Sequence, residues 1–259
     1  MKKKIIRSWL YVSCAVVLGL LISSPVFAAH PLITDDTGTQ GKGKFQLEVN
    51  GEYAHEKEDG ATENTMQLAA TLSYGISDPL DIVLSVPYRF IRYRDSGISS
   101  NEKGFSDLTL EAKLRFFESD GLSFAFKPGI TLPAGDDEKG LGAGKATYHL
   151  FFIASEEAKP WAFHLNLGYI RNENKVDDRK NIWHASLAST VEVIKDLKIV
   201  MNAGIEKDTD RNSHENPAFI LGGLIYSLSE NFDIDFGIKG GLTKPEADVA
   251  FLAGISHRF

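Results

Sequence analysis

The chain has 259 residues, a formal net charge of −7 and one cysteine. Its first 28 residues hold four basic and no acidic residues, so the rest of the chain sets 24 basic against 35 acidic residues, a net charge of −11. Nucleic acid requires a basic binding face, and this surplus of carboxylates excludes it as a partner.

Residues 1–28 have the pattern of a cleaved signal peptide. A positively charged start precedes an apolar run over residues 9–22, and Val26-Phe27-Ala28 places small residues at the −3 and −1 positions of a cleavage site. The apolar run is shorter than the roughly 18–20 residues of a membrane-spanning helix, which argues against an uncleaved anchor. Cleavage after Ala28 also removes Cys14, so we expect an exported chain without disulfides.

The remaining chain divides into residues 29–43, expected to form a short periplasmic segment, and residues 44–259, where apolar side chains occupy every second position. A period of two is typical of strands. The alternating segments lie at 45–53, 66–74, 80–88, 108–116, 122–132, 148–154, 161–169, 182–193, 197–206, 218–228, 232–238 and 251–259. The sequence therefore predicts an all-β fold of about 12 antiparallel strands.

Three features favour a transmembrane β-barrel over a soluble sandwich, which shows the same alternation. The strand number is even, and long and short connections alternate, as the outer loops and periplasmic turns of bacterial outer-membrane barrels do. Aromatic side chains also gather at the strand ends, where rings lie at membrane interfaces. We expect outer-membrane lipid to surround the barrel. We expect the long connections near 55–63, 91–104, 133–145, 171–181, 207–217 and 243–248.

The polar face of the strands is predicted to line the lumen. In the opposite orientation Lys113, Lys127 and Lys198 would point into hydrocarbon, at a cost of roughly 2–4 kcal/mol each near the midplane. Six charged residues of the polar face are the candidate lining of a passage: Glu48, Arg89, Glu111, Arg115, Lys127 and Lys239. We expect the loop 133–145 to limit access. The same charges could instead form an ion-pair network that fills a narrow barrel.

Three local motifs do not support other chemistry. The glycine-rich run 140–145 ends in a lysine followed by alanine, whereas a phosphate-binding loop requires Ser or Thr there. The spacing of Asp136-Asp137-Glu138 is not that of a calcium-binding loop, so we expect no metal site. His149, His164 and His184 are accompanied by neither a Gly-x-Ser-x-Gly nor a His-Glu-x-x-His motif, so we expect no catalytic residues.

Four stretches carry a family resemblance. They are His30-Pro-Leu-Ile-Thr-Asp-Asp-Thr-Gly-Thr-Gln-Gly41, Gly104-Phe-Ser-Asp-Leu108, Lys127-Pro-Gly-Ile-Thr-Leu-Pro-Ala-Gly-Asp136 and Ala253-Gly-Ile-Ser-His-Arg-Phe259. Together they resemble the outer-membrane proteins of the MetA pathway of phenol degradation. The resemblance implies a barrel fold, an outer-membrane location and the passage of small, aromatic or hydrophobic compounds, and it supplies no catalytic residues. His257 stands where that family usually has an aromatic or aliphatic residue.

We therefore expect a channel or transporter-like barrel of the Gram-negative outer membrane that passes small solutes, with neither enzyme activity nor a cofactor. Two alternatives stay open: a barrel enzyme of the lipid hydrolase or protease type, and a non-conducting structural barrel. The terminal Phe259 resembles the recognition signal of the barrel-assembly machinery, which is therefore an expected partner.

Overall fold

The computed structural model describes residues 30–58 and 60–259. The predicted signal peptide, residues 1–28, lies outside the described residues. Within them, no helix is long and apolar enough to cross a membrane, and the helical structure is a single 3-10 turn at Asp137–Lys139.

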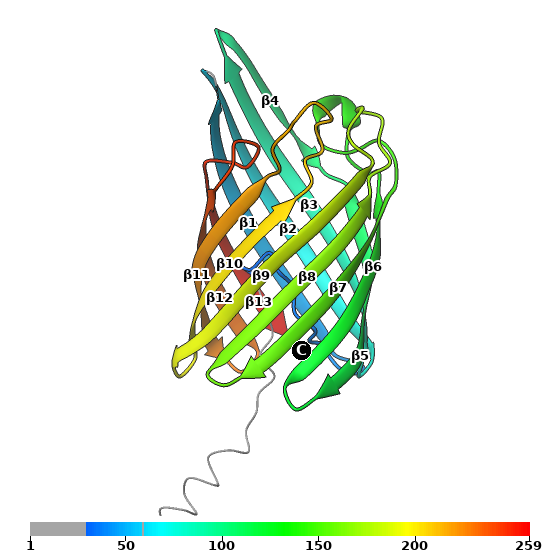
Figure 1. Ribbon diagram of the computed structural model, residues 1–259, viewed down its shortest axis with the longest axis vertical. Coiled ribbons are helices and arrows are strands. Elements are labelled where there is room, and N and C mark those ends of the chain that lie inside the picture. Colours follow the sequence, from blue (N-terminus) through cyan, green and yellow to red (C-terminus); the bar gives the residue numbers. More distant parts are fainter. Residues whose placement is uncertain (1–29, 59) are drawn as a thin grey trace, which may run out of the picture.

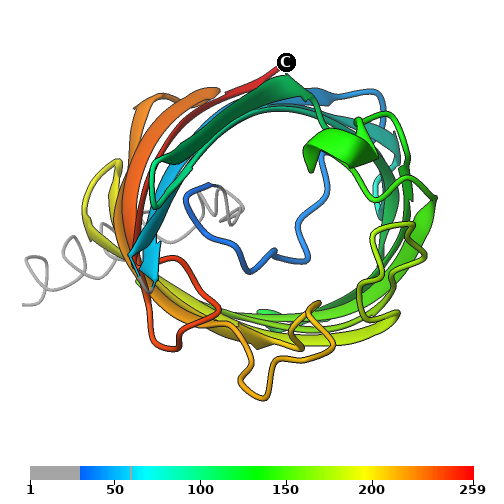
Figure 2. The same cartoon turned by 90° about the horizontal axis from the view of Figure 1, so that it is seen from above.

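Thirteen antiparallel strands form one sheet in the described part of the chain. Their bounds are β1 Phe45–Glu58, β2 Ala61–Ser77, β3 Leu80–Asp95, β4 Ile98–Phe105, β5 Leu108–Ser119, β6 Leu122–Leu132, β7 Thr147–Ala158, β8 Trp161–Arg171, β9 Asn181–Ile194, β10 Leu197–Glu206, β11 Ala218–Ser229, β12 Phe232–Gly241 and β13 Val249–Arg258. Because β1 pairs with both β2 and β13, the sheet closes into a barrel (Figures 1 and 2).

Strands β4 and β5 share one position in the barrel wall. β3 pairs with β5 along Leu80–Ser85 and with β4 along Tyr88–Asp95, and only Ser106 and Asp107 separate the two partner strands. The barrel thus has twelve strand positions, which confirms the fold that the alternation predicts.

Two connections that we expected to be loops are mostly strand. Residues 55–63 and 91–104 form the outer ends of β1, β2 and β3 and most of β4, and these four strands reach beyond the rest of the rim (Figure 1). Polar and charged residues occupy both faces there, so the apolar alternation that reveals a half-buried strand is lost while the backbone pairing continues.

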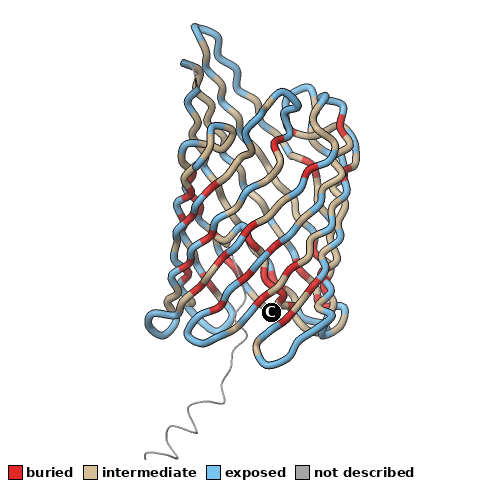
Figure 3. Tube along the Cα trace, in the orientation of Figure 1, coloured by how far each residue is buried: buried red, intermediate tan, exposed pale blue. Residues whose placement is uncertain are grey.

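The two faces of the wall differ as a barrel in lipid requires. Apolar side chains such as Val49, Leu84 and Leu167 are exposed on the outside, whereas Lys113 and Asn202 are buried. Lipid can cover the apolar outer face, and the polar inner face must find partners within the barrel. Figure 3 shows that buried residues concentrate in the half of the barrel nearer the short turns.

The last residue closes the barrel against the first strand. Phe45 and Phe259 exchange two backbone hydrogen bonds of 2.8 and 2.9 Å. Their rings stack with centroids 5.6 Å apart, and the His257 ring stacks on Phe259 at 5.5 Å. His257 therefore packs as an aromatic ring at the position where the resembled family usually has an apolar residue.

Candidate functional site

The segment before the first strand lies inside the barrel. We expected residues 29–43 to form a periplasmic segment, but residues 30–43 run through the lumen, inside the outline of the wall (Figure 2). Thr34 is 1% and Asp36 is 2% exposed. We call residues 30–43 the lumen segment. Its sequence has no periodicity, so the sequence alone gave no signal of where it binds.

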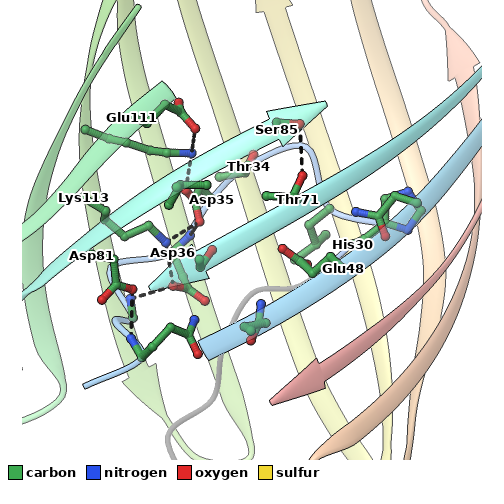
Figure 4. Close-up of a pocket in the computed structure, with 18 of the residues that line it drawn as sticks. His30, Thr34, Asp35, Asp36, Glu48, Thr71, Asp81, Ser85, Glu111 and Lys113 are labelled. Carbon is green, nitrogen blue, oxygen red and sulfur yellow. Dashed lines mark hydrogen bonds and ion pairs between the residues drawn. The ribbon is translucent and has the colours of Figure 1, made fainter. Parts of the chain in front are cut away.

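Ion pairs at Asp35 join the lumen segment to two strands of the wall. Asp35 Oδ1 lies 2.8 Å from Lys113 Nζ on β5, and its Oδ2 lies 3.0 Å from Lys127 Nζ on β6. Lys127 also contacts Glu111 Oε2 at 3.0 Å, and Glu111 Oε1 lies 2.9 Å from His149 Nε2 on β7. These ion pairs, with the hydrogen bond to His149, connect the lumen segment to three strands; Figure 4 shows the part around Asp35, Lys113 and Glu111.

Side chains of the wall also bind the backbone of the lumen segment. Asn202 Oδ1 on β10 accepts hydrogen bonds from the backbone nitrogens of Ile33 (2.8 Å) and Thr34 (3.1 Å), and Asn202 Nδ2 donates to Thr34 Oγ1 (2.6 Å). With its amide oriented to satisfy both groups, Asn166 on β8 accepts from the backbone nitrogen of Asp35 (2.8 Å) and donates to its carbonyl (2.9 Å). These bonds satisfy backbone groups that would otherwise be buried without partners.

Further along, the segment crosses to the opposite side of the lumen. Thr37 Oγ1 lies 2.5 Å from Ser123 Oγ on β6, and its backbone nitrogen donates to Ser155 Oγ on β7 (3.1 Å). The backbone nitrogen of Gln40 then donates to Asp81 Oδ2 on β3 (2.9 Å). The lumen segment is therefore held by strands around the barrel and not along one wall alone.

An apolar patch completes the contact of the lumen segment. Inward side chains of β10, β11 and β13 form a small buried cluster against which Leu32 packs. Alternation alone does not orient residues 218–228, because both faces of this segment are apolar. Phe219, Leu221 and Ile225 are the buried face, while Ile220 and Leu224 are 55% and 45% exposed.

Adjacent carboxyls of the lumen segment have opposite proton affinities. Burial raises the pKa of Asp36 to about 7, against the charge of Lys113 and with the support of neighbouring Asp35. Burial acts on Asp35 as well, but the ammonium groups of Lys113 and Lys127 outweigh it and hold its pKa well below the ordinary range. Asp35 therefore remains ionised while Asp36 titrates near neutral pH.

A cavity of about 250 Å³ remains between the lumen segment and the wall. The wall side consists of residues from β1, β2, β3, β5 and β6, among them Glu48, Thr71 and Ser85 (Figure 4). The lumen segment supplies the other side with His30, Thr34 and their neighbours. The lining is mostly polar, which suits water and small polar solutes.

The structure brings three of the six predicted lining residues together. Glu48, Glu111 and Lys127 all line this cavity. The other three lie elsewhere, each with its own partner. Arg89 Nη1 is 3.5 Å from the carbonyl of Gly140, and Arg115 Nε is 3.2 Å from Glu118 Oε2. Lys239 Nζ lies 2.9 Å from Glu52 and 3.0 Å from Glu246.

The loop 133–145 folds inward at the opposite end of the barrel, inside the outline of the wall (Figure 2). Asp107, between β4 and β5, holds it by accepting hydrogen bonds from the backbone nitrogens of Gly135 (2.9 Å) and Ala143 (2.8 Å). Leu141 is 2% exposed. A Cβ at Gly142 would lie 2.3 Å from Asp107 Oδ1, so only glycine permits this approach. Our sequence reasoning missed Asp107, although it lies in one of the motifs that carry the resemblance.

One Ser–His pair resembles part of a hydrolase site, but it is buried and a substrate cannot reach it. Ser155 Oγ lies 2.9 Å from His164 Nδ1. The two residues are 4% and 1% exposed, and Ser155 already binds the lumen segment. A nucleophile must reach its substrate, and this serine is covered.

With this geometry in place, comparison with known proteins decides the family. The family model of the MetA pathway of phenol degradation matches residues 28–259. The chain belongs to this family. No curated protein matches it.

Solved structures similar to this family member are outer-membrane barrels. A channel from Pseudomonas putida F1 has a TM-score of 0.67 at 15% identity, over 86% of this chain and 98% of that one. The β domain of the Bordetella autotransporter BrkA has a TM-score of 0.55 at 12% identity, over 84% and 100%. The KdgM porin in complex with disordered oligogalacturonate has a TM-score of 0.50 at 12% identity, over 83% and 99%. At these identities the likeness shows the barrel fold.

Proposed function

We propose that this protein is a channel of the Gram-negative outer membrane that passes small solutes through a narrow lumen. The observation that carries the proposal is the polar cavity of about 250 Å³ beside the lumen segment. A barrel that served only as a scaffold would gain by filling this space, because a void forfeits packing contacts along its lining. The lumen segment and the loop 133–145 narrow the passage from opposite ends.

The charges along this route support limited selectivity. Glu111 and Lys127 neutralise each other beside Asp35, and Lys239 is paired with two carboxylates. Strongly selective pores carry rings of one sign, and these paired charges form no such ring. We expect both small cations and small anions to pass.

Aromatic or hydrophobic solutes are the substrate class that the family description favours. The cavity lining contributes hydrogen-bonding groups such as Thr71 and Ser85, together with apolar Val83 and Leu32. This mixed lining suits a small ring that bears a hydroxyl or carboxyl group.

The structure also favours a channel over a barrel hydrolase. The hydrolase is considered because Ser155 and His164 form a hydrogen-bonded pair. The covered position of Ser155 and His164 leaves no room for a lipid or peptide. We therefore propose that their hydrogen bond orients Ser155 toward the backbone of Thr37 and that the protein has no enzyme activity.

Liposome swelling tests the channel directly. Ser85→Trp places a large ring in the cavity, whereas Ser99→Trp places the same ring on exposed β4. Proteoliposomes with wild-type protein should swell in glycerol and in benzoate, and Ser85→Trp should slow swelling severalfold while Ser99→Trp should not. Thr71→Phe provides a second obstruction if Ser85→Trp does not fold. Wild-type vesicles that swell no faster than protein-free vesicles would refute the channel.

A further inference from the structure

The outer face of the β1–β4 extension has an unusual set of residues. Cross-strand partners share one face of a sheet, and alternate residues along a strand return to it. The outward rows, taken from β1 to β4, are Tyr53–Met66–Phe90–Lys103, His55–Asn64–Arg92–Asn101 and Lys57–Thr62–Arg94–Ser99. We call these twelve residues the outer basic face.

Charge on this extension is segregated by face. The outer basic face holds four cations, Lys57, Arg92, Arg94 and Lys103, and no carboxylate. The carboxylates of the same strands stand at the alternate positions, on the face toward the lumen: Glu56, Glu58, Glu63, Asp95 and Glu102. A strand that merely needs solubility has no reason to separate the signs, since mixed charges dissolve as well. The segregation indicates an anionic partner on the outside.

The four cations are exposed and available to such a partner. None of their charged groups takes part in an ion pair within residues 30–58 and 60–259. Arg92 Nε donates to Asn101 Oδ1 at 3.0 Å, which orients the guanidinium group. The nearby Asp248 carboxylate accepts a hydrogen bond from the backbone nitrogen of Lys57 at 2.9 Å and forms no ion pair in the part of the chain that the structure describes.

A groove of about 420 Å³ lies on this face. Its apolar floor is Tyr53, Met66 and Phe90, which are 44%, 41% and 39% exposed. Arg92 and Lys103 stand beside that floor. The groove lining includes one carboxylic residue, Glu102, whose position in the strand alternates with the outward ones. An apolar floor next to cations fits an amphiphile with an anionic head.

The height of the groove places it at the membrane interface. Along the outside of β3, apolar residues run from Leu80 to Phe90 and are followed by Arg92 and Arg94. These eleven residues lie within the roughly 9–11 of a membrane-spanning strand, so the hydrocarbon ends near Phe90. Tyr53 lies in the same row, as expected for an interfacial aromatic ring. The cations therefore stand at the level of the outer-leaflet headgroups, since the longer loops are on this side.

We propose that the outer basic face binds a phosphorylated, acylated glycolipid of the outer leaflet, of the lipid A type. An acyl chain lies over Tyr53, Met66 and Phe90, and the headgroup phosphates contact the four cations. These cations span four adjacent strands, roughly 14 Å at the usual strand spacing. This spread is wider than a single phosphate can bridge, which favours a headgroup with two phosphates over a glycerophospholipid. Arg in particular offers paired donors to phosphate oxygens.

Native mass spectrometry of the detergent-solubilised protein provides the test. The variant Lys57→Gln, Arg92→Gln, Arg94→Gln and Lys103→Gln removes the four cations. A matched control removes four exposed cations at the short-turn end: Lys42→Gln, Lys44→Gln, Lys159→Gln and Lys195→Gln. The probes are bisphosphorylated lipid A, the same lipid without phosphates, and phosphatidylglycerol. Heat-modifiable gel migration verifies that each variant is folded.

Wild type and control should bind lipid A, and the fourfold variant should bind it about a hundredfold more weakly, since each cation at an anionic lipid surface contributes severalfold. Loss of the phosphates should weaken binding to wild type by a similar factor. The proposal is wrong if the fourfold variant binds lipid A as the control does. Equal binding of phosphatidylglycerol and lipid A to wild type would also overturn it, because the face would then recognise any anionic lipid.

Discussion

Asp35 is the residue on which most of the lumen segment's electrostatics depends. Its carboxylate is shared between Lys113 and Lys127, whose side chains are 11% and 17% exposed. In such surroundings a charge without its partner is costly, so the three groups hold one another in place. These ion pairs fix the position of the lumen segment in the barrel, because they form only where Asp35 lies between Lys113 and Lys127.

Replacing Asp35 with Asn should release the lumen segment. Two buried ammonium groups would lose their shared carboxylate, at a cost of about 3–5 kcal/mol. Hydrogen exchange of the backbone amides of residues 33–40 should become much faster, while amides within the strands keep their protection. Asp120→Asn, in an exposed turn, is the matched control. Unchanged protection of residues 33–40 in Asp35→Asn would contradict the account.

Asp36 should make the binding of the lumen segment depend on pH. Lys113, Lys198, Asp35 and Glu48 are the charged groups that act on it. Its pKa is about 7 when bound and ordinarily 3.8. The bound state thus takes up a proton between these values while the released state does not, so binding weakens as pH rises toward 7.

Hydrogen exchange corrected for its intrinsic pH dependence measures this effect. Protection of residues 33–39 should be about tenfold to a hundredfold greater at pH 5 than at pH 8. In Asp36→Asn the difference should largely disappear. Protection that rises with pH in the wild type would show that the sign is wrong.

At the scale of elements, the sequence predicts the strands whose two faces differ in polarity. Every strand that crosses the apolar band alternates, and β1–β3 and β5–β13 were located from that pattern. β4 was missed because it lies largely beyond the membrane, where neither face needs to be apolar. The pattern also could not orient β11, because its inner face packs on Leu32 of another segment.

The contacts of the lumen segment could not be predicted from periodicity for a different reason. Asp35 and Lys113 are separated by 78 positions in the chain, and Asn202 lies 168 positions from Thr34. Polar contacts over such distances leave no periodic trace in a single sequence. The candidate lining residues could be assigned to the inner face by alternation, but which of them meet depends on how the barrel closes.

The terminal strand allows a prediction about assembly. Phe259 connects β13 to Phe45 through two backbone hydrogen bonds and a ring stack. Deleting Phe259 should lower the amount of folded protein in outer-membrane fractions severalfold, more than Leu224→Ala, which removes another exposed apolar side chain, from mid-strand. Equal amounts of the two variants would argue against a special role for the last residue.

The whole molecule combines a rigid wall with a separate internal segment. The wall has no unpaired edge within the membrane band, because β1 and β13 close it. The lumen segment contributes no strand to that wall, and hydrogen bonds between its residues 30–40 and the wall involve side chains. Removal of the lumen segment should therefore leave the barrel folded and widen the passage. An effect on conduction can then be measured without an effect on folding.

Single-channel recording in planar bilayers tests this claim most directly. Three forms are compared: wild type, a chain lacking residues 30–40 after the signal peptide, and Thr37→Cys with Ser123→Cys, whose disulfide locks the lumen segment to β6. The hydroxyl oxygens at these two positions are 2.5 Å apart, which brings the two side chains together, and a thiol assay verifies that the disulfide has formed. We predict a small conductance in wild type, a similar one in the locked form and a severalfold larger one in the deletion. Absence of current in all three would contradict the channel, and equal current in wild type and the deletion would contradict the constriction.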